Sequence, residues 1–234
     1  MMTLIIGKRC CDGVILGADR RSLRGLEPNE QNKINQIRLE IDSVKSQILL
    51  AGAGVGAFWE EIAWSSEHYI NGINEPKVKT FIDAVSGVSL LSTNLSVRYQ
   101  HGGMDEQLGC VLAGLDMLNT GKAKLYYFAG VGFSETAFIC LGSGSAYALS
   151  LAGVLLNATD ITTDEAMRFL PLIFLLVERV TVSVAGGPDI FIVKDNEQPV
   201  SVPTKHLETS RTTANYLIEN VPKVLNKVIA TSKS

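Results

Sequence analysis

The chain has 234 residues, of which 46% are hydrophobic and 19% are charged, and its formal net charge at pH 7 is −3. This composition supports a sizeable hydrophobic core and argues against a disordered chain. No cluster of lysine and arginine is present, so nucleic acid and anionic membranes are poor partner candidates. The longest apolar runs are too short to span a bilayer. We expect a single domain over residues 1–234 that contacts neither membrane nor nucleic acid.

The cysteine and histidine spacings indicate neither a disulfide framework nor a metal site. The four cysteines show no C-x-x-C pattern, and two of them, Cys10 and Cys11, are adjacent. Reduced thiols are typical of an intracellular protein, and the first residues carry no basic stretch of the kind that opens a signal peptide. The three histidines are scattered without ligand spacing. We therefore expect a cytoplasmic protein with no metal and no cofactor.

A hairpin is predicted at the start of the chain. Two apolar, β-branched runs, Leu4–Ile6 and Val14–Leu16, flank the pair Asp12-Gly13. Asp-Gly between apolar runs favours a tight primed turn, because its central residues need positive φ. Folding the chain about this turn brings Thr3 close to Asp19 on the partner strand.

The middle of the chain shows strands and helices in separate groups. After the hairpin, polar residues 24–32 predict a loop. Alternating or short apolar runs then predict strands, and apolar residues three or four apart predict helices. The expected strands span 33–39, 46–51, 107–115, 123–128 and 135–141, and the expected helices span 58–70, 81–95 and 143–156.

Two helices and a hairpin are expected in the last third. Thr162 and Glu165 form a capping-box pattern that opens a helix, and Pro171 should kink it. A final hairpin is predicted from 180–184 and 190–193. A C-terminal amphipathic helix, expected to dock on the same chain or on a neighbour, is defined by Leu217, Val221, Val224, Leu225 and Val228.

The order of these elements favours a layered α+β fold over alternating βαβ units, because strands and helices occur in separate runs. Two antiparallel sheets packed face to face, with a pair of helices on each outer side, would bury this pattern. The run Gly52-x-Gly54-x-Gly56 is not interpreted as a phosphate loop, because no Lys-Ser/Thr follows and no βαβ unit surrounds it.

Several segments carry a family resemblance in the same order along the chain. They are the hairpin, Asp19-Arg20-Arg21-Ser22, Lys33-Ile34-Asn35-Gln36-Ile37, Ala51-Gly52-Ala53-Gly54 and Leu141-Gly142-Ser143-Gly144-Ser145-Ala146-Tyr147-Ala148. Together they resemble the catalytic β-type subunits of the proteasome, up to about residue 193. The resemblance implies the four-layer αββα sandwich of the N-terminal nucleophile hydrolases. It also implies a threonine-type endopeptidase of extended polypeptides in homo- or hetero-oligomeric rings, with α-type subunits as candidate partners.

The resemblance also implies site residues. Thr3, once it is the first residue, would be the nucleophile, and its own α-amino group would take the hydroxyl proton. Lys33 would place a positive charge near that hydroxyl, and Asp19 would hold Lys33. The Gly52 N–H would face the oxyanion, and Ser143 would bond the amine.

Five further residues are expected to contact the substrate by the same resemblance. Leu50, Gly54 and Phe58 would line the pocket for the residue before the scissile bond, and Arg21 and Ser22 would lie along the peptide. An extended peptide would add as a strand beside the cleft.

Two departures from the family pattern keep other interpretations open. Val182 and Ala185 stand where the family has Asp and Ser that support the amine, with Ser183 nearby, and Met1-Met2 precede Thr3. The chain is therefore an endopeptidase, a structural ring subunit without catalysis, or an amidohydrolase or transpeptidase that passes an acyl group to an amine. On the structural reading, Thr3 is an edge-strand residue and Ser143 a turn residue, and the carboxylate–lysine pair is a plain ion pair.

Overall fold

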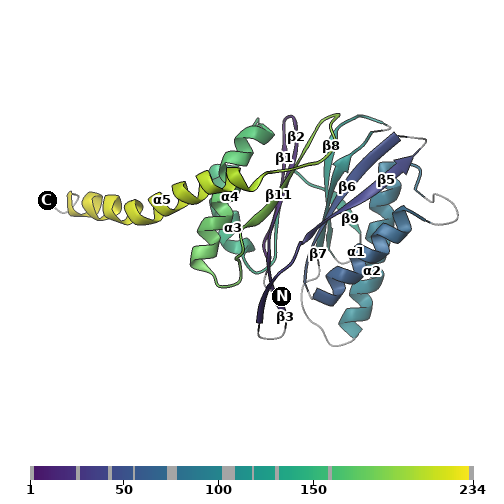
Figure 1. Cartoon of the computed structure of the whole chain (residues 1–234), viewed down its shortest axis with the longest axis horizontal. Coiled ribbons are helices and arrows are strands. Elements are labelled where there is room, and N and C mark those ends of the chain that lie inside the picture. Colours follow the sequence, from purple (N-terminus) through teal and green to yellow (C-terminus); the bar gives the residue numbers. More distant parts are fainter. Residues whose placement is uncertain are drawn as a thin grey trace.

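The computed structural model describes residues 3–24, 27–41, 44–54, 56–72, 78–101, 109–117, 119–129, 132–157 and 160–231 (Figure 1). The strands are β1 (Ile5–Cys10), β2 (Gly13–Asp19), β3 (Arg21–Arg24), β4 (Glu27–Glu30), β5 (Ile34–Ile41), β6 (Val44–Ala53), β7 (Gly109–Leu115), β8 (Ala123–Ala129), β9 (Phe133–Glu135), β10 (Phe138–Leu141), β11 (Pro188–Lys194) and β12 (Val200–Ser201). The helices are α1 (Gly56–Ile70), α2 (Phe81–His101), α3 (Ser145–Leu155), α4 (Thr163–Val180) and α5 (Thr204–Thr231).

Two antiparallel sheets form the centre of the fold. Their strand orders are β10-β1-β2-β11-β12 and β5-β6-β7-β8-β9. Figure 1 shows α3 and α4 on the outer side of the first sheet and α1 and α2 on the outer side of the second. One cluster of buried side chains fills the space between the sheets, and two others lie under the helix pairs. The layers are therefore α, β, β and α, which confirms the predicted sandwich.

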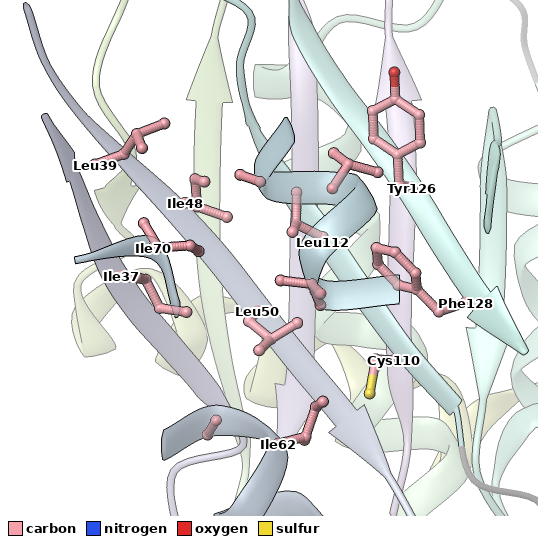
Figure 2. Close-up of a cluster of buried hydrophobic side chains, with 14 of the residues drawn as sticks. Ile37, Leu39, Ile48, Leu50, Ile62, Ile70, Cys110, Leu112, Tyr126 and Phe128 are labelled. Atoms are coloured by element: carbon pink, nitrogen blue, oxygen red, sulfur yellow. The ribbon is translucent and has the colours of Figure 1, made fainter. Parts of the chain in front are cut away.

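Both faces of each sheet are apolar, because the side chains of a strand point alternately to the helix layer and to the opposite sheet. In β6, Ile48 and Leu50 pack under α1 and α2, as Figure 2 shows, while Leu49 and Ala51 face the opposite sheet. Successive strand residues point to opposite faces, so a strand between a helix layer and another sheet needs apolar residues at every position. The continuous apolar run in β6 is thus what a middle layer requires.

Two sequence predictions were wrong in detail. Residues 24–32 were expected to form a loop, but β3 and β4 pair over Arg21–Glu30 as a two-stranded ribbon. The hairpin expected from 180–184 and 190–193 does not form, because α4 continues through Pro171 to Val180. Strand β11 instead pairs with β2, whose second edge is open once β1 occupies the first.

Helix α5 docks on its own chain through its first half. Leu172 and Leu175 of α4 pack with Ala214 of α5, and Leu217 lies partly buried beside them. Figure 1 shows the rest of α5 projecting away from the sandwich. The side chains of Val221, Val224, Leu225 and Val228 lie outside the described part, so the prediction for them stays open. Among the described residues, no helix has the length and apolar character needed to cross a membrane.

Candidate active site

Thr3 lies just before β1, and its side chain is fully buried. β1 and β2 are antiparallel, and Ile5 is paired with Ala18. This register carries Thr3 to the end of β2, where Asp19 is the last residue. The hairpin therefore brings Thr3 and Asp19 together as predicted, although Cys11 and Asp12 form its turn rather than Asp12 and Gly13.

One carboxylate oxygen of Asp19 binds two groups of the site. Asp19 Oδ1 accepts a hydrogen bond from the Leu4 N–H at 2.7 Å and from Lys33 Nζ at 2.8 Å. The Asp19 and Lys33 side chains are 1% and 0% exposed. Because the Leu4 nitrogen is bonded to the carbonyl carbon of Thr3, the shared oxygen fixes the lysine beside the Thr3 backbone. Thr3, Asp19 and Lys33 thus form one buried cluster.

Burial shifts the pKa values of Asp19 and Lys33 in opposite directions. Loss of water raises the pKa of the Asp19 carboxyl, and the positive charge of Lys33 opposes the shift. Loss of water lowers the pKa of Lys33, and the negative charge of Asp19 opposes that shift. Burial therefore makes Lys33 a better proton donor than a surface lysine, and its neutral form more accessible.

The loop between β10 and α3 closes around the backbone of Thr3. The Thr3 nitrogen lies 3.3 Å from Ser143 Oγ, and the Gly144 N–H donates to the Thr3 carbonyl oxygen at 3.4 Å. Gly142 has φ +91°, and a β-carbon there would lie 2.2 Å from the Thr3 carbonyl oxygen. The loop therefore needs glycine at 142, both for its conformation and for space.

We expect Gly142→Ala to destabilise the protein more than a matched substitution elsewhere. Gly132 also has positive φ (+113°), but a β-carbon there would meet nothing within 4 Å. Gly132→Ala should therefore cost about 1–2 kcal/mol from backbone strain alone. Gly142→Ala adds the collision with Thr3, so its denaturant midpoint should fall clearly further. Equal midpoints for the two variants would contradict this account of the loop.

Gly52 lies near the end of β6 and makes room for an aromatic ring. A β-carbon at Gly52 would lie 2.1 Å from Trp59 Cε3, and Trp59 itself is 2% exposed. Two residues later, Gly54 takes φ +133° where the chain leaves β6 toward α1. Glycine is thus required at 52 by packing and at 54 by conformation.

The residues expected to contact substrate are not all gathered at the cluster. Leu50 and Phe58 are fully buried in the cluster beneath α1 and α2. Arg21 opens β3, and its N–H donates to the Ala185 carbonyl at 3.0 Å. Ser22 pairs with Asn29 in the β3–β4 ribbon, and its side chain lies outside the described part. Their contact with substrate stays a prediction.

The segment after α4 supports the site differently from the family pattern. Val182 is 75% exposed, so an aspartate there would face solvent rather than Thr3. Ser183 is buried, and its hydroxyl lies 2.6 Å from Thr181 Oγ1. Ala185 is the position held against the site, through its bond to the Arg21 N–H. Of the two family positions, Ala185 is the one placed beside the first residue of β3.

An arginine–aspartate contact near the site was missed in the sequence. Arg20 Nε donates to Asp189 Oδ1 at 2.9 Å, and the Arg20 N–H donates to the Gly187 carbonyl. These bonds tie the end of β2 to the start of β11. The two residues are 169 positions apart, so only the strand pairing could have revealed the contact.

Burial makes three of the four thiols weak nucleophiles. All four cysteines are free. Burial raises the pKa of Cys10, Cys110 and Cys140 to about 12, so these thiols stay protonated at neutral pH. Within the described residues, no group of three or more His, Cys, Asp and Glu side chains is arranged to hold a metal ion.

The chain is similar to known proteins in sequence and in fold. No protein-family model matches the sequence. A proteasome subunit beta of Nanoarchaeum equitans (strain Kin4-M) is 29% identical over 170 residues, which cover 71% of this chain and 80% of that protein.

Solved structures of Anbu proteins share the fold. Anbu (ancestral beta-subunit) from Yersinia bercovieri has a TM-score of 0.75 at 15% identity and covers 93% of this chain and 95% of its own. A Gly-1 mutant of Anbu from Hyphomicrobium sp. strain MC1 has a TM-score of 0.77 at 16% identity, covering 96% and 97%. Anbu in a helical assembly from Pseudomonas aeruginosa has a TM-score of 0.74 at 17% identity, covering 94% and 96%.

Fold and topology together define an αββα sandwich of the N-terminal nucleophile hydrolase type. The sequence match then narrows the class. This chain is similar in sequence to a proteasome β-type subunit, at 29% identity.

Proposed function

We propose that this protein is an N-terminal threonine peptidase that hydrolyses peptide bonds of unfolded or extended polypeptides. The observation that carries the proposal is the buried Asp19–Lys33 pair, which shares one oxygen with the backbone next to Thr3. A buried ion pair is costly to build and weak as a source of stability. Its position beside the buried Thr3 favours a chemical role over a purely structural one.

The proposed reaction starts once Thr3 is the first residue. The Thr3 hydroxyl attacks the scissile carbonyl carbon, its proton passes to the Thr3 α-amine, and an ester forms as the peptide C–N bond breaks. The resulting α-ammonium then protonates the departing amine. A water molecule next attacks the ester carbonyl carbon and gives one proton to the α-amine. The ester C–O bond breaks, the acid is released, and the α-ammonium returns the proton to the Thr3 oxygen. A free α-amine has a pKa near about 7.7–8.0, so it can act as a base at neutral pH.

The neighbouring groups prepare Thr3 for this step. The Lys33 ammonium favours loss of the hydroxyl proton by stabilising the negative oxygen, and its lowered pKa makes it a ready proton donor to that oxygen. Ser143 Oγ lies 3.3 Å from the Thr3 nitrogen that would become the α-amine, so it would orient that group. The Gly52 N–H is the proposed donor to the oxyanion.

The substrate is proposed to bind as an extended strand beside the cleft, along Arg21, Ser22 and Gly54. Leu50 and Phe58 are fully buried, so they would reach a substrate side chain only if α1 moved. We also propose that the protein works as an oligomer. The helical assembly of the Anbu complex from Pseudomonas aeruginosa supports self-assembly within this fold. Rings, and α-type subunits as partners, remain part of the same proposal.

A second candidate function is a structural β-type subunit without catalysis. It is favoured by the apolar residues at the two family positions that normally support the amine, Val182 and Ala185. Neither Val182 nor Ala185 has a carboxylate or a hydroxyl that it could offer to the amine. Transfer of the acyl group to an amine, as in an amidohydrolase or transpeptidase, would use the same ester at Thr3.

Covalent labelling distinguishes these candidates. Protein that begins at Thr3, prepared by cleaving a tag directly before it, should gain the mass of one peptidyl vinyl sulfone per chain. Thr3→Ala should abolish this labelling, while Thr212→Ala, on an exposed part of α5, should keep it. A chain that begins at Thr3 and is folded but stays unlabelled would support the structural candidate. Added amine that diverts a cleaved peptide from acid to amide would support acyl transfer.

A further inference from the structure

The space around Gly52 limits which substrate residue can lie before the scissile bond. In the proposed reaction, the Gly52 N–H binds the oxyanion that forms from the scissile carbonyl. That carbonyl belongs to the residue before the scissile bond, and its side chain branches from the carbon next to the carbonyl. This side chain must therefore find room close to Gly52.

Strand pairing places Gly52 next to the buried cluster that contains Thr3. Ile34 of β5 is paired with Ala51 of β6. Continuing this antiparallel register brings Lys33, which lies just before β5, next to Gly52. Lys33 belongs to the cluster around Thr3. A carbonyl attacked by Thr3 would thus lie near Gly52 without any rearrangement of the sheet.

The indole ring of Trp59 occupies the space over one face of Gly52. A β-carbon at Gly52 would lie 2.1 Å from Cε3 and 2.7 Å from Cζ3 of this ring, so not even a methyl group fits there. Trp59 is 2% exposed and belongs to the buried cluster beneath α1 and α2. Moving the indole aside would disturb a close-packed core.

The same packing closes off two residues that were expected to line the pocket. Leu50 and Phe58 are fully buried in the cluster that contains Trp59. Leu50 points to the same side of β6 as Gly52, because residues two apart in a strand share a face. Phe58 directly precedes Trp59 in α1. The volume that a large substrate side chain would need is therefore filled by side chains of this protein.

We infer that Trp59 fills the pocket for the residue before the scissile bond and restricts that residue to glycine or alanine. The inference rests on the proposed peptidase function and adds the class of cleavage site that the enzyme accepts. A larger side chain would have to displace the indole. One methylene group in an apolar pocket changes kcat/KM by roughly 10–200-fold, so alanine should be preferred over leucine by at least about 100-fold.

Substrate preference of the unmodified site tests the inference without a mutation. Protein that begins at Thr3 is treated with peptidyl vinyl sulfones that differ only in the residue at the reactive group, alanine or leucine. The alanine reagent should label at least about 100-fold faster. Equal or faster labelling by the leucine reagent would overturn the inference and leave the proposed function standing. Folded protein that neither reagent labels would overturn both.

A smaller side chain at position 59 should weaken or reverse the preference. Trp59→Leu keeps the core apolar but removes the indole, so the rate ratio of leucine to alanine reagent should rise at least about tenfold. Trp64→Leu is the matched control, because Trp64 lies on the same helix but is 62% exposed. Its ratio should equal that of the unmodified protein. The ratio is compared because a general loss of activity does not change it, and equal ratios for the two variants would contradict the role of Trp59.

Tryptophan fluorescence provides a readout that does not require Trp59→Leu to fold. The chain has two tryptophans, so Trp64→Leu leaves Trp59 as the single one. Full labelling of this variant by the alanine reagent should change the emission of Trp59, because the bound residue would contact the indole. An emission spectrum that stays the same after full labelling would exclude this contact and overturn the inference.

Discussion

Lys33→Ala is expected to lower the peptidase activity of protein that begins at Thr3 by on the order of 10³-fold or more. Losses of this size are typical when a group that acts together with the nucleophile is removed. Lys33 is fully buried and bound to the oxygen that also holds the backbone next to Thr3, so no other lysine can replace it. Single-turnover cleavage of a fluorogenic peptide measures the effect.

Two further variants separate charge from proton transfer at this position. Lys33→Arg keeps a positive charge, but a guanidinium does not give up its proton near neutral pH. We expect it to remain as inactive as Lys33→Ala, because the lowered pKa of Lys33 indicates a group that shares a proton. Lys194→Ala removes a lysine of an exposed ion pair and should keep full activity. Wild-type rates for Lys33→Ala would exclude the proposed role.

Asp19→Asn is expected to destabilise the fold by about 3–5 kcal/mol near neutral pH. Removing one partner of a buried ion pair leaves the other charge buried without compensation. The matched control is Asp164→Asn, whose pair with Lys194 lies on the surface and should contribute about 0–1 kcal/mol. Denaturant unfolding of both variants beside the wild type measures the difference. A loss for Asp19→Asn no larger than the control would contradict the burial of the charge.

The stability of Asp19→Asn should depend on pH through Lys33, which stays buried without its carboxylate partner. Burial lowers the pKa of Lys33 in the folded protein, and Asp19 opposes that shift, so the variant should lower it further. A group whose folded pKa lies below its unfolded value loses stability as pH falls and regains it as pH rises toward the unfolded pKa. The deficit of Asp19→Asn should therefore shrink between pH 7 and pH 10. A deficit that grows over this interval would contradict a buried, partly neutralised Lys33.

Local sequence patterns were enough to predict the structure where residues close together in the chain determine the backbone conformation. The Asp12-Gly13 pattern predicted the first hairpin correctly, and its strands pair from Ile5–Ala18 to Cys10–Gly13. The predicted turn was wrong by one residue, since Cys11 and Asp12 form it, and neither Asp12 nor Gly13 has positive φ. The capping box at Thr162 and Glu165 begins α4 as expected. The order of strands and helices then predicted the layers. In each case the deciding residues are neighbours in the chain, so their effect can be read without knowing the fold.

The wrong predictions concern segments whose strand partner could not be read from the sequence. Residues 180–184 alternate like a strand, but α4 extends to Val180 and the edge of β2 is taken by β11. Residues 24–32 contain polar and turn-forming types, yet part of the segment pairs as β4 with β3. Strand pairing depends on which strand edges are still unpaired in the folded sheet, and a local sequence pattern does not contain that information.

The sequence by itself determined the hairpin, the grouping of strands and helices, and the presence of Thr3, Asp19 and Lys33 as groups suited to the chemistry. Only the tertiary structure decided how they meet. It buried the lysine and placed it on the same oxygen as the Leu4 N–H, it wrapped Gly142 and Ser143 around Thr3, and it turned Val182 to solvent. The reason is that pKa shifts, close contacts and exposure arise from atoms that are distant in the chain and meet only when the sheets and helix layers have packed.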